Sequence, residues 1–175
     1  MQLSDERIKL FPLGESDLQF CLEILTCSEL MAHVSTPLTN EEAKSVFDIR
    51  SQPWDKNSDK WLALVITDIE LGKKAGWVSL RILDHDTKTA EIGFILKSSF
   101  HGKSIVSDAL KILKEYAYND LGLNKLVAIC SVHNTPSYKV LEKAGFIREG
   151  CLMQNALISN QYVDTFAYGL CKSAL

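Results

Sequence analysis

Cysteine and histidine are the residue types that most often carry nucleophilic or metal chemistry. The 175-residue sequence contains five cysteines and four histidines. Cys130 and His133 are close enough in sequence to suggest a thiol nucleophile with its base. On a strand, however, residues three apart point to opposite faces, so we do not expect this pair to act together. The cysteines form no C-x-x-C pair, and the histidines show no metal-ligand spacing. The pattern predicts reduced thiols and no bound metal.

A carboxylate within an apolar run is a second candidate for chemistry. Glu91 lies inside the segment Thr89–Leu96, which has the composition of a strand. A carboxylate on a half-buried strand can acquire a pKa that suits proton abstraction. Glu91 is therefore a candidate general base, acting directly or through a water molecule. The alternative is a charged side chain on the solvent face of the strand, and both interpretations stay open here.

The elements that must position these residues follow from hydrophobic periodicity. Apolar residues at helical spacing predict helices over residues 15–27 and 105–117. A capping box of Thr39 with Glu42 predicts a helix up to about Arg50, and Pro136 and Gly145 bracket a short helix. Alternation or short apolar runs predict strands at residues 7–11, 61–67, 75–83, 89–96, 126–132 and 161–171, with another strand starting at 146–148.

The order of these elements defines the expected fold class. Helices alternate with strands only in the second half of the chain, while three strands follow one another in the middle. This order predicts a mixed α/β fold, with a largely antiparallel twisted sheet of about seven strands flanked by helices. The length is typical of one domain, so residues 1–175 are expected to form a single domain.

Charge and hydropathy exclude several function classes. The net charge is −3 and no stripe of Lys and Arg is present, which argues against direct nucleic-acid binding. No run approaches the roughly 18–20 apolar residues that span a bilayer. The chain starts with acidic and polar residues instead of a secretory signal, so we expect a cytoplasmic location.

Two segments carry a resemblance to a known family. The first is AEIGFIL at residues 90–96, followed by FHGKSIVSDAL at 100–110; the second is NTPSYKVLEKAGF at 134–146, followed by Glu149-Gly150. Both resemble the GNAT acetyltransferase superfamily. The second segment, with residues 6–13 and 164–170, resembles in particular the branch that contains the ribosomal-protein N-terminal acetyltransferases RimJ and RimL. The resemblance covers nearly the whole chain and implies a GNAT-like sheet with acetyl-CoA as co-substrate.

The resemblance also implies a cofactor site. The backbone of Phe94, Ile95 and Leu96 is expected to pair with the pantetheine amides. The N–H groups at the start of the helix would bind the pyrophosphate, which assigns His101, Gly102, Lys103, Ser104, Ile105 and Val106 to the site, with Asn134 as a further contact. The family signature Gln/Arg-x-x-Gly-x-Gly/Ala is altered at its three key positions, which here hold His101, Ser104 and Val106.

These departures have physical consequences. If position 104 requires a positive φ, serine carries a penalty of roughly 1–2 kcal/mol, equal to about a tenfold or greater loss of affinity. Val106 is bulkier than the residue it replaces and would crowd the start of a helix. His101 has two interpretations: a cation paired with phosphate, or a neutral ring that caps the loop.

In the resembling family the amine attacks bound acetyl-CoA directly in a ternary complex. Many members use a tyrosine to protonate the departing thiolate, but the matching position here is Leu141. Ser137 is expected to serve as the donor near the sulfur or as a cofactor contact. Its alternative is a first-turn serine that bonds only to backbone.

Three hypotheses remain for the function. The branch resemblance favours a protein N-terminal amine, such as that of a ribosomal protein. A small amine such as a polyamine or an aminoglycoside is the second, and an acidic pocket built from Glu15, Asp17, Glu41 and Asp164 would favour it. The third is a non-catalytic acyl-CoA-binding module, because the phosphate signature is altered. An exposed last strand could also pair across a homodimer.

Overall fold

The computed structural model describes residues 1–174. The helices are α1 (Leu18–Leu25), α2 (Ser28–Met31), α3 (Asn40–Arg50), α4 (Ile105–Glu115) and α5 (Thr135–Lys143), with a π turn (Tyr116–Asp120) after α4. The strands are β1 (Leu3–Ser4), β2 (Ile8–Pro12), β3 (Leu62–Asp68), β4 (Lys73–Asp84), β5 (Thr89–Leu96), β6 (Lys125–Ser131), β7 (Ile147–Ile158) and β8 (Gln161–Cys171).

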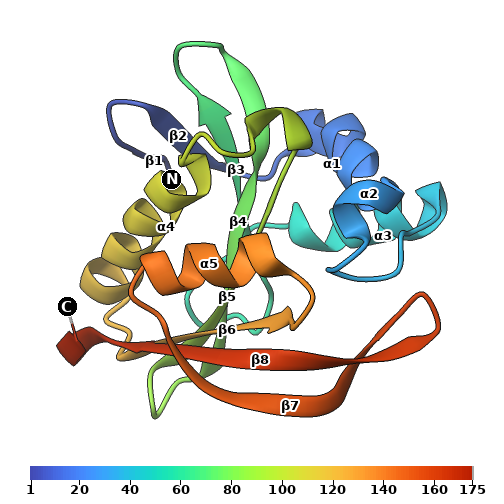
Figure 1. The fold of residues 1–175 in the computed structure, drawn as a ribbon. Helices are drawn as coiled ribbons and strands as arrows, with labels where there is room; N and C mark the ends of the chain where they lie inside the picture. Colours follow the sequence, from blue (N-terminus) through green and yellow to red (C-terminus); the bar gives the residue numbers. More distant parts are fainter. Residues whose placement is uncertain (175) are drawn as a thin grey trace.

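All eight strands form one sheet in the order β1-β2-β3-β4-β5-β6-β8-β7 (Figure 1). Every neighbouring pair is antiparallel except β5 and β6, which run parallel. The expected mixed sheet flanked by helices is therefore confirmed. It has eight strands instead of about seven, because the two-residue strand β1 adds to the edge at β2.

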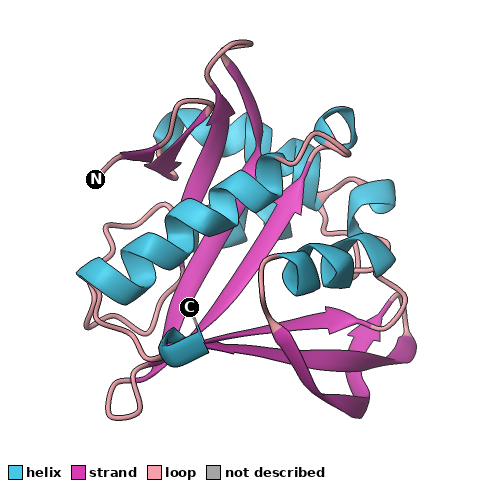
Figure 2. Cartoon of the chain, turned by 60° about the vertical axis from the view of Figure 1, so that its left-hand side comes forward, coloured by secondary structure: helices cyan, strands magenta, loops and turns pink. Residues whose placement is uncertain are grey.

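Helices cover both faces of the sheet, and each face has its own core (Figure 2). In β5 the side chains of Ala90 and Ile92 join the core beneath α4, while Ile95 joins the core beneath α1 and α3. This is the alternation that a strand imposes. One strand thus contributes to both layers of the molecule.

The last strand is not exposed, which corrects the expectation of a dimer formed through it. β8 is paired with β6 on one side and with β7 on the other, so its backbone groups are already used. The strand at this edge of the sheet is β7, which is far longer than the sequence indicated. Its residues are mostly exposed, so it has no apolar alternation that would reveal its length.

Candidate active site

A cleft opens where β5 and β6 separate. The two strands pair only over residues 89–91 of β5 and 125–127 of β6, although β5 continues to Leu96 and β6 to Ser131. Beyond these residues the two strands splay apart. The resulting cavity is about 640 Å³. It is lined by the end of β5, by the segment 98–107 without Ser99 and Lys103, by one side of α5, and by part of residues 29–34, which we call the α2 segment.

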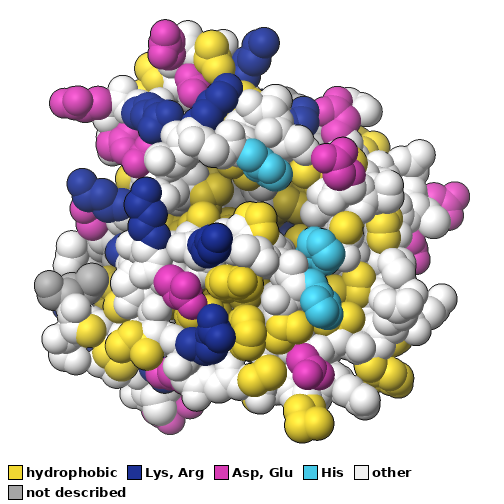
Figure 3. Space-filling model, in the orientation of Figure 1, with side chains coloured by type: hydrophobic (Ala, Val, Ile, Leu, Met, Phe, Trp, Pro, Cys, Tyr) yellow, Lys and Arg dark blue, Asp and Glu magenta, His cyan; other side chains and the backbone are white. Residues whose placement is uncertain are grey.

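The cleft is largely apolar, with polar groups around its rim. Figure 3 shows hydrophobic side chains on the floor of the hollow, with histidine and basic side chains near its edge. Phe94, Ile95 and Leu96 form part of this lining. Opposite the end of β5, a side chain at Gly76 would collide with the Ile95 carbonyl, so the glycine permits the close approach of β4 and β5.

The loop before α4 is shaped by two residues with positive φ. Gly102 has φ 74° and Ser104 has φ 60°. Ser104 is the N-cap of α4, yet its side chain makes no capping hydrogen bond. Position 104 thus has the positive φ that was considered from the sequence, and the serine carries left-handed strain of about 1–2 kcal/mol. Ser104 and the first residues of α4 line the cleft, and the first N–H groups of a helix have no partner within the helix.

The side chains of Ile105 and Val106, which follow Ser104, are buried in the core. Ile105 is 1% exposed and Val106 is 8% exposed, and both side chains pack in the core beneath α4. Val106 therefore does not crowd the opening of the helix in the way that its branched side chain had indicated. Contacts from these two positions to a ligand would come mainly from backbone N–H groups at the helix start.

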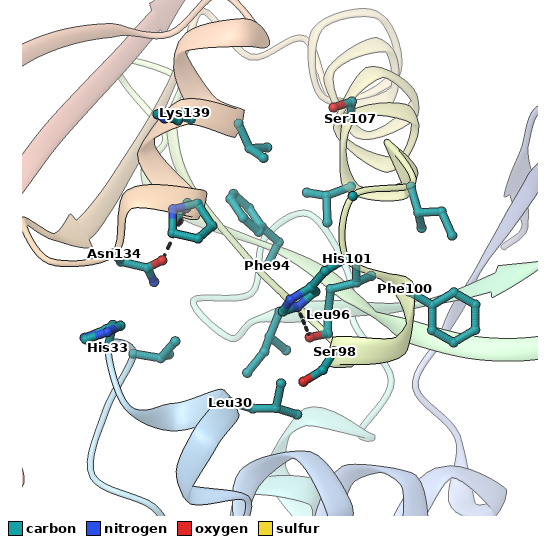
Figure 4. A pocket seen from close by; sticks show the side chains of 18 of the residues that line it. Leu30, His33, Phe94, Leu96, Ser98, Phe100, His101, Ser107, Asn134 and Lys139 are labelled. Carbon is teal, nitrogen blue, oxygen red and sulfur yellow. Dashed lines mark hydrogen bonds between the residues drawn. The ribbon is translucent and has the colours of Figure 1, made fainter.

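His101 is held by a hydrogen bond within the loop. Its Nε2 lies 3.0 Å from the carbonyl oxygen of Leu96, and because a carbonyl can only accept, the ring donates. The bond, drawn in Figure 4, ties the loop to the end of β5 and favours the loop-capping interpretation. Lys103 lies outside the cleft lining: its ammonium is over the Phe100 ring at 5.3 Å, and its carbonyl accepts a 2.6 Å bond from Arg7.

The start of α5 forms the facing wall. Asn134 is the N-cap, and its Oδ1 accepts a 3.2 Å hydrogen bond from the Ser137 N–H. Both residues line the cleft, as do Lys139 and Lys143 further along the helix. No motif or spacing in the sequence marked these two lysines as binding residues.

Cys130 is buried and is not among the residues that line the cleft. Burial raises the pKa of its thiol to about 11, with smaller opposing effects from Arg148 and from the Ser137 hydroxyl. The thiol is therefore protonated at neutral pH. Across residues 1–174, no three His, Cys, Asp or Glu side chains are arranged to hold a metal ion.

The structure does not bring Glu91 to the cleft. Its carboxylate pairs with Arg81 at 2.7 Å, on the face of β5 opposite Phe94, and it is not part of the cleft lining. This placement fits the alternative of a charged side chain outside the site. Proton transfer by Glu91 would have to pass through other groups.

The four acids proposed for a cationic acceptor do not converge either. Asp17 is buried and bonded to Lys74, and Asp164 accepts a hydrogen bond from the Gln154 backbone at 2.7 Å. None of the four, which include Glu15 and Glu41, lines the cleft. The α2 segment supplies Glu29, Leu30, His33 and Val34 instead. Sequence reasoning missed this segment because α2 has only four residues and no helical periodicity.

Comparison with known proteins identifies the family. The model for the acetyltransferase (GNAT) domain matches residues 7–147. The uncharacterized N-acetyltransferase YnaD of Bacillus subtilis is 30% identical over 176 residues, which cover 97% of this chain and 96% of that protein. The chain belongs to the GNAT acetyltransferase family. It is accordingly an N-acetyltransferase that uses acetyl-CoA, and the resemblance seen in the sequence is confirmed.

Other GNAT relatives differ in their acceptors. Spermidine N(1)-acetyltransferase of Escherichia coli K12 is 29% identical over 91% of this chain and 83% of that protein. The ribosomal-protein-serine acetyltransferase of the same strain is 37% identical over 53% of this chain and 52% of its own length. The chain spans about half the length of several curated relatives, including that one.

A solved GNAT structure shares the whole fold. Spermidine N-acetyltransferase from Vibrio cholerae, in complex with CoA and spermine, has a TM-score of 0.84 at 20% identity, covering 97% of this chain and 98% of that one. A likeness of this degree shows the common fold. No helix among residues 1–174 is long and apolar enough to cross a membrane.

Proposed function

We propose that the protein acetylates the α-amine at the N-terminus of a peptide chain, of the ribosomal-protein type. The observation that carries this proposal is the charge of the cleft: among the described residues, Glu29 is its only carboxylate. A polyamine carries several positive charges, and recognising them calls for several acids. A single ammonium on an otherwise uncharged peptide end suits an apolar cleft with one acid.

We propose that three parts of the cleft hold acetyl-CoA, and we call them together the cofactor wall. The N–H groups of residues 102–106 would hold the pyrophosphate at the start of α4, where the helix dipole favours negative charge. The backbone of Phe94, Ile95 and Leu96 would pair with the pantetheine amides on the side left free by β6. Asn134 retains its amide nitrogen, which makes no hydrogen bond within residues 1–174, for a contact with the ligand.

Bound acetyl-CoA supplies the activated thioester. Within the protein, one N–H near the end of β5 would polarise the thioester carbonyl. The Ser137 hydroxyl, beside the cleft, would donate a proton or hydrogen bond at the sulfur. The acceptor amine would attack directly in a ternary complex. Lys139 and Lys143 add positive charge to the same wall, which suits an anionic ligand.

A small polyamine is the second candidate acceptor. The match to a spermidine acetyltransferase over 91% of this chain favours it, and Glu29 would be the acid that binds one of its amines. The two candidates differ in how many carboxylates the acceptor side must offer. The described residues of the cleft offer one.

The acceptor is tested with purified protein, acetyl-CoA and three amine pools: peptides with free N-termini, spermidine with spermine, and aminoglycosides. Mass spectrometry of the products is expected to find acetyl groups on peptide α-amines, with lower kcat/KM for the polyamines. Higher kcat/KM for spermidine would overturn the peptide proposal. Binding of acetyl-CoA with no product from any pool would favour an acyl-CoA-binding module.

The cofactor wall is tested separately by calorimetric titration with acetyl-CoA. Ser107 lines the cleft in the first turn of α4, so Ser107→Trp is expected to abolish saturable one-to-one binding. Lys111→Trp lies on the exposed face of the same helix and is the matched control. Equal affinity for the two variants would move the cofactor site elsewhere.

A further inference from the structure

The wall of the cleft formed by the α2 segment has no assigned role. The residues proposed to hold the cofactor come from β5, the loop before α4, and α5. Glu29, Leu30, His33 and Val34 face them from the other side. In Figure 4, His33 lies near the Asn134 end of the cleft, while His101 lies toward Leu96 and Ser98. An acceptor entering opposite the cofactor wall would meet the α2 segment first.

Acetyl transfer requires an acceptor amine that has lost its proton, and few side chains here can take one. The charged or titratable side chains that line the cleft are Glu29, His33, His101, Lys139 and Lys143. The lysines are cations. His101 belongs to the opposite wall, and its Nε2 hydrogen is already donated to the Leu96 carbonyl. Glu91 lies outside the cleft, in an ion pair with Arg81.

His33 and Glu29 are thus the two possible proton acceptors on the acceptor side. The His33 ring is exposed and makes no hydrogen bond to any described residue, so both of its nitrogens can reach a ligand. We infer that His33 is the general base that removes a proton from the ammonium group of the acceptor. The inference rests on the proposed function, because it assumes that the acceptor enters along the α2 segment.

The chemistry of the acceptor favours imidazole over carboxylate. An α-ammonium group ordinarily has a pKa of about 7.7–8.0, an imidazole about 6.5 and a glutamate about 4.3. Proton transfer from an α-ammonium to imidazole is uphill by a factor of about 30, and to a carboxylate by a factor of more than about 10³. For an amine such as that of lysine, with a pKa of about 10.4, transfer to imidazole is uphill by about 10⁴. An imidazole base therefore matches an α-amine.

The protons balance in two steps. The neutral His33 ring takes one proton from the ammonium group and releases it to solvent. The amine lone pair then forms the C–N bond, the C–S bond of the thioester breaks, and the second amine proton ends on the sulfur through the Ser137 hydroxyl or directly. Glu29, Lys139, Lys143 and His101 are the charged or titratable groups that share the cleft with His33.

The test compares His33→Gln with Glu29→Gln, using His85→Gln in the exposed β4–β5 turn as the matched control. For His33→Gln, kcat/KM at pH 7 is expected to fall by about 10²-fold or more. Its pH profile should also lose the inflection that a titrating general base contributes to the wild-type profile. Glu29→Gln and His85→Gln should keep that inflection. A wild-type profile in His33→Gln, or loss of the inflection in Glu29→Gln, would overturn the inference.

Two further readouts separate this inference from the proposed function. The dissociation constant of acetyl-CoA should be the same for wild type and His33→Gln, since His33 acts on the other substrate. If the wild type acetylates spermidine in place of peptides, the peptide proposal fails, and the same profiles recorded with spermidine still decide on His33. In a protein with labelled histidines, the His33 ring signal should shift when the acceptor is added; an unmoved signal with every acceptor would overturn the inference.

Discussion

Arg81 and Glu91 face each other across β4 and β5, with 2.7 Å between Nη2 and Oε2. The pair lies outside the cleft, and the Arg81 guanidinium also lies 4.9 Å from the centre of the Trp61 ring. Glu91 thus has a partner that holds its carboxylate away from the cleft. The ion pair of Glu91 with Arg81 connects the neighbouring strands β4 and β5.

Replacing this carboxylate is therefore expected to affect folding more than catalysis. Glu91→Gln should lower the free energy of unfolding by about 1 kcal/mol, because the pair is partly exposed. It should change kcat/KM by less than about tenfold, whereas removing a general base costs 10²–10⁴-fold. Urea unfolding and steady-state kinetics give the two values. A hundredfold loss of kcat/KM with an intact fold would restore Glu91 as the base.

Ser104 offers a stabilising substitution at the cofactor loop. Its φ of 60° belongs to the folded backbone, so the strain is expected to lower the stability of the fold. Ser104→Gly should raise the free energy of unfolding by up to about 1 kcal/mol, since the larger chain entropy of glycine offsets part of the gain.

The matched control is Ser104→Ala, which keeps the strain and removes only a hydroxyl that makes no capping bond. It should leave stability nearly unchanged, and the acetyl-CoA dissociation constant should change little in both variants. Denaturant unfolding and calorimetry measure these effects. If the glycine variant is the less stable one, the serine is making a contact that compensates for its strain.

The sequence predicts elements well where one face is buried. Residues 89–96 and 161–171 have the expected bounds because their apolar residues alternate or form a run, and the Thr39–Glu42 capping box marks the start of α3. The start of β7 was predicted, but its length was not, because the strand is exposed along most of its course. Helix α2 was missed because it is a single turn.

The site itself depended on contacts distant in sequence. The family motifs pointed to the loop before α4 and to the start of α5, and both line the cleft. No local pattern could show that Arg81 pairs with Glu91, or that His33 lies across the cleft from α5, since such contacts depend on how the sheet and helices pack. The acceptor side was therefore the part that needed the structure.

Tyr168 links α5 to the sheet and can be tested alone. It is 1% exposed; its hydroxyl donates to Glu142 Oε1 at 2.8 Å and accepts from Arg148 Nε at 3.1 Å. Tyr168→Phe should lower the free energy of unfolding by about 1–2 kcal/mol, because two bonds to charged groups are lost.

The same substitution should weaken the cleft indirectly, since Glu142 belongs to the helix that carries Asn134 and Ser137. Hydrogen exchange is expected to be faster in α5 than in α4 of the variant. Tyr162→Phe, at an exposed position of β8, is the control. Unchanged exchange in α5 would show that the hydroxyl does not hold the helix in place.

Alkaline pH should destabilise the protein before its basic residues titrate. Burial is the largest cause that raises the pKa of Cys21 and Tyr118 to about 12 and of Cys130 to about 11, from ordinary values of 9.0 for cysteine and 10.0 for tyrosine. Above about pH 9 the unfolded chain therefore loses thiol protons that the folded chain keeps. The free energy of unfolding should therefore fall by about 1.4 kcal/mol per pH unit for each thiol above about pH 9. Below about pH 9 the contribution of these thiols to stability is fully present.

Urea unfolding at pH 8, 9 and 10 measures the slope, and Cys130→Ala should make it shallower. A flat profile from pH 8 to 10 would mean that these thiols ionise as readily in the folded protein as in the unfolded chain.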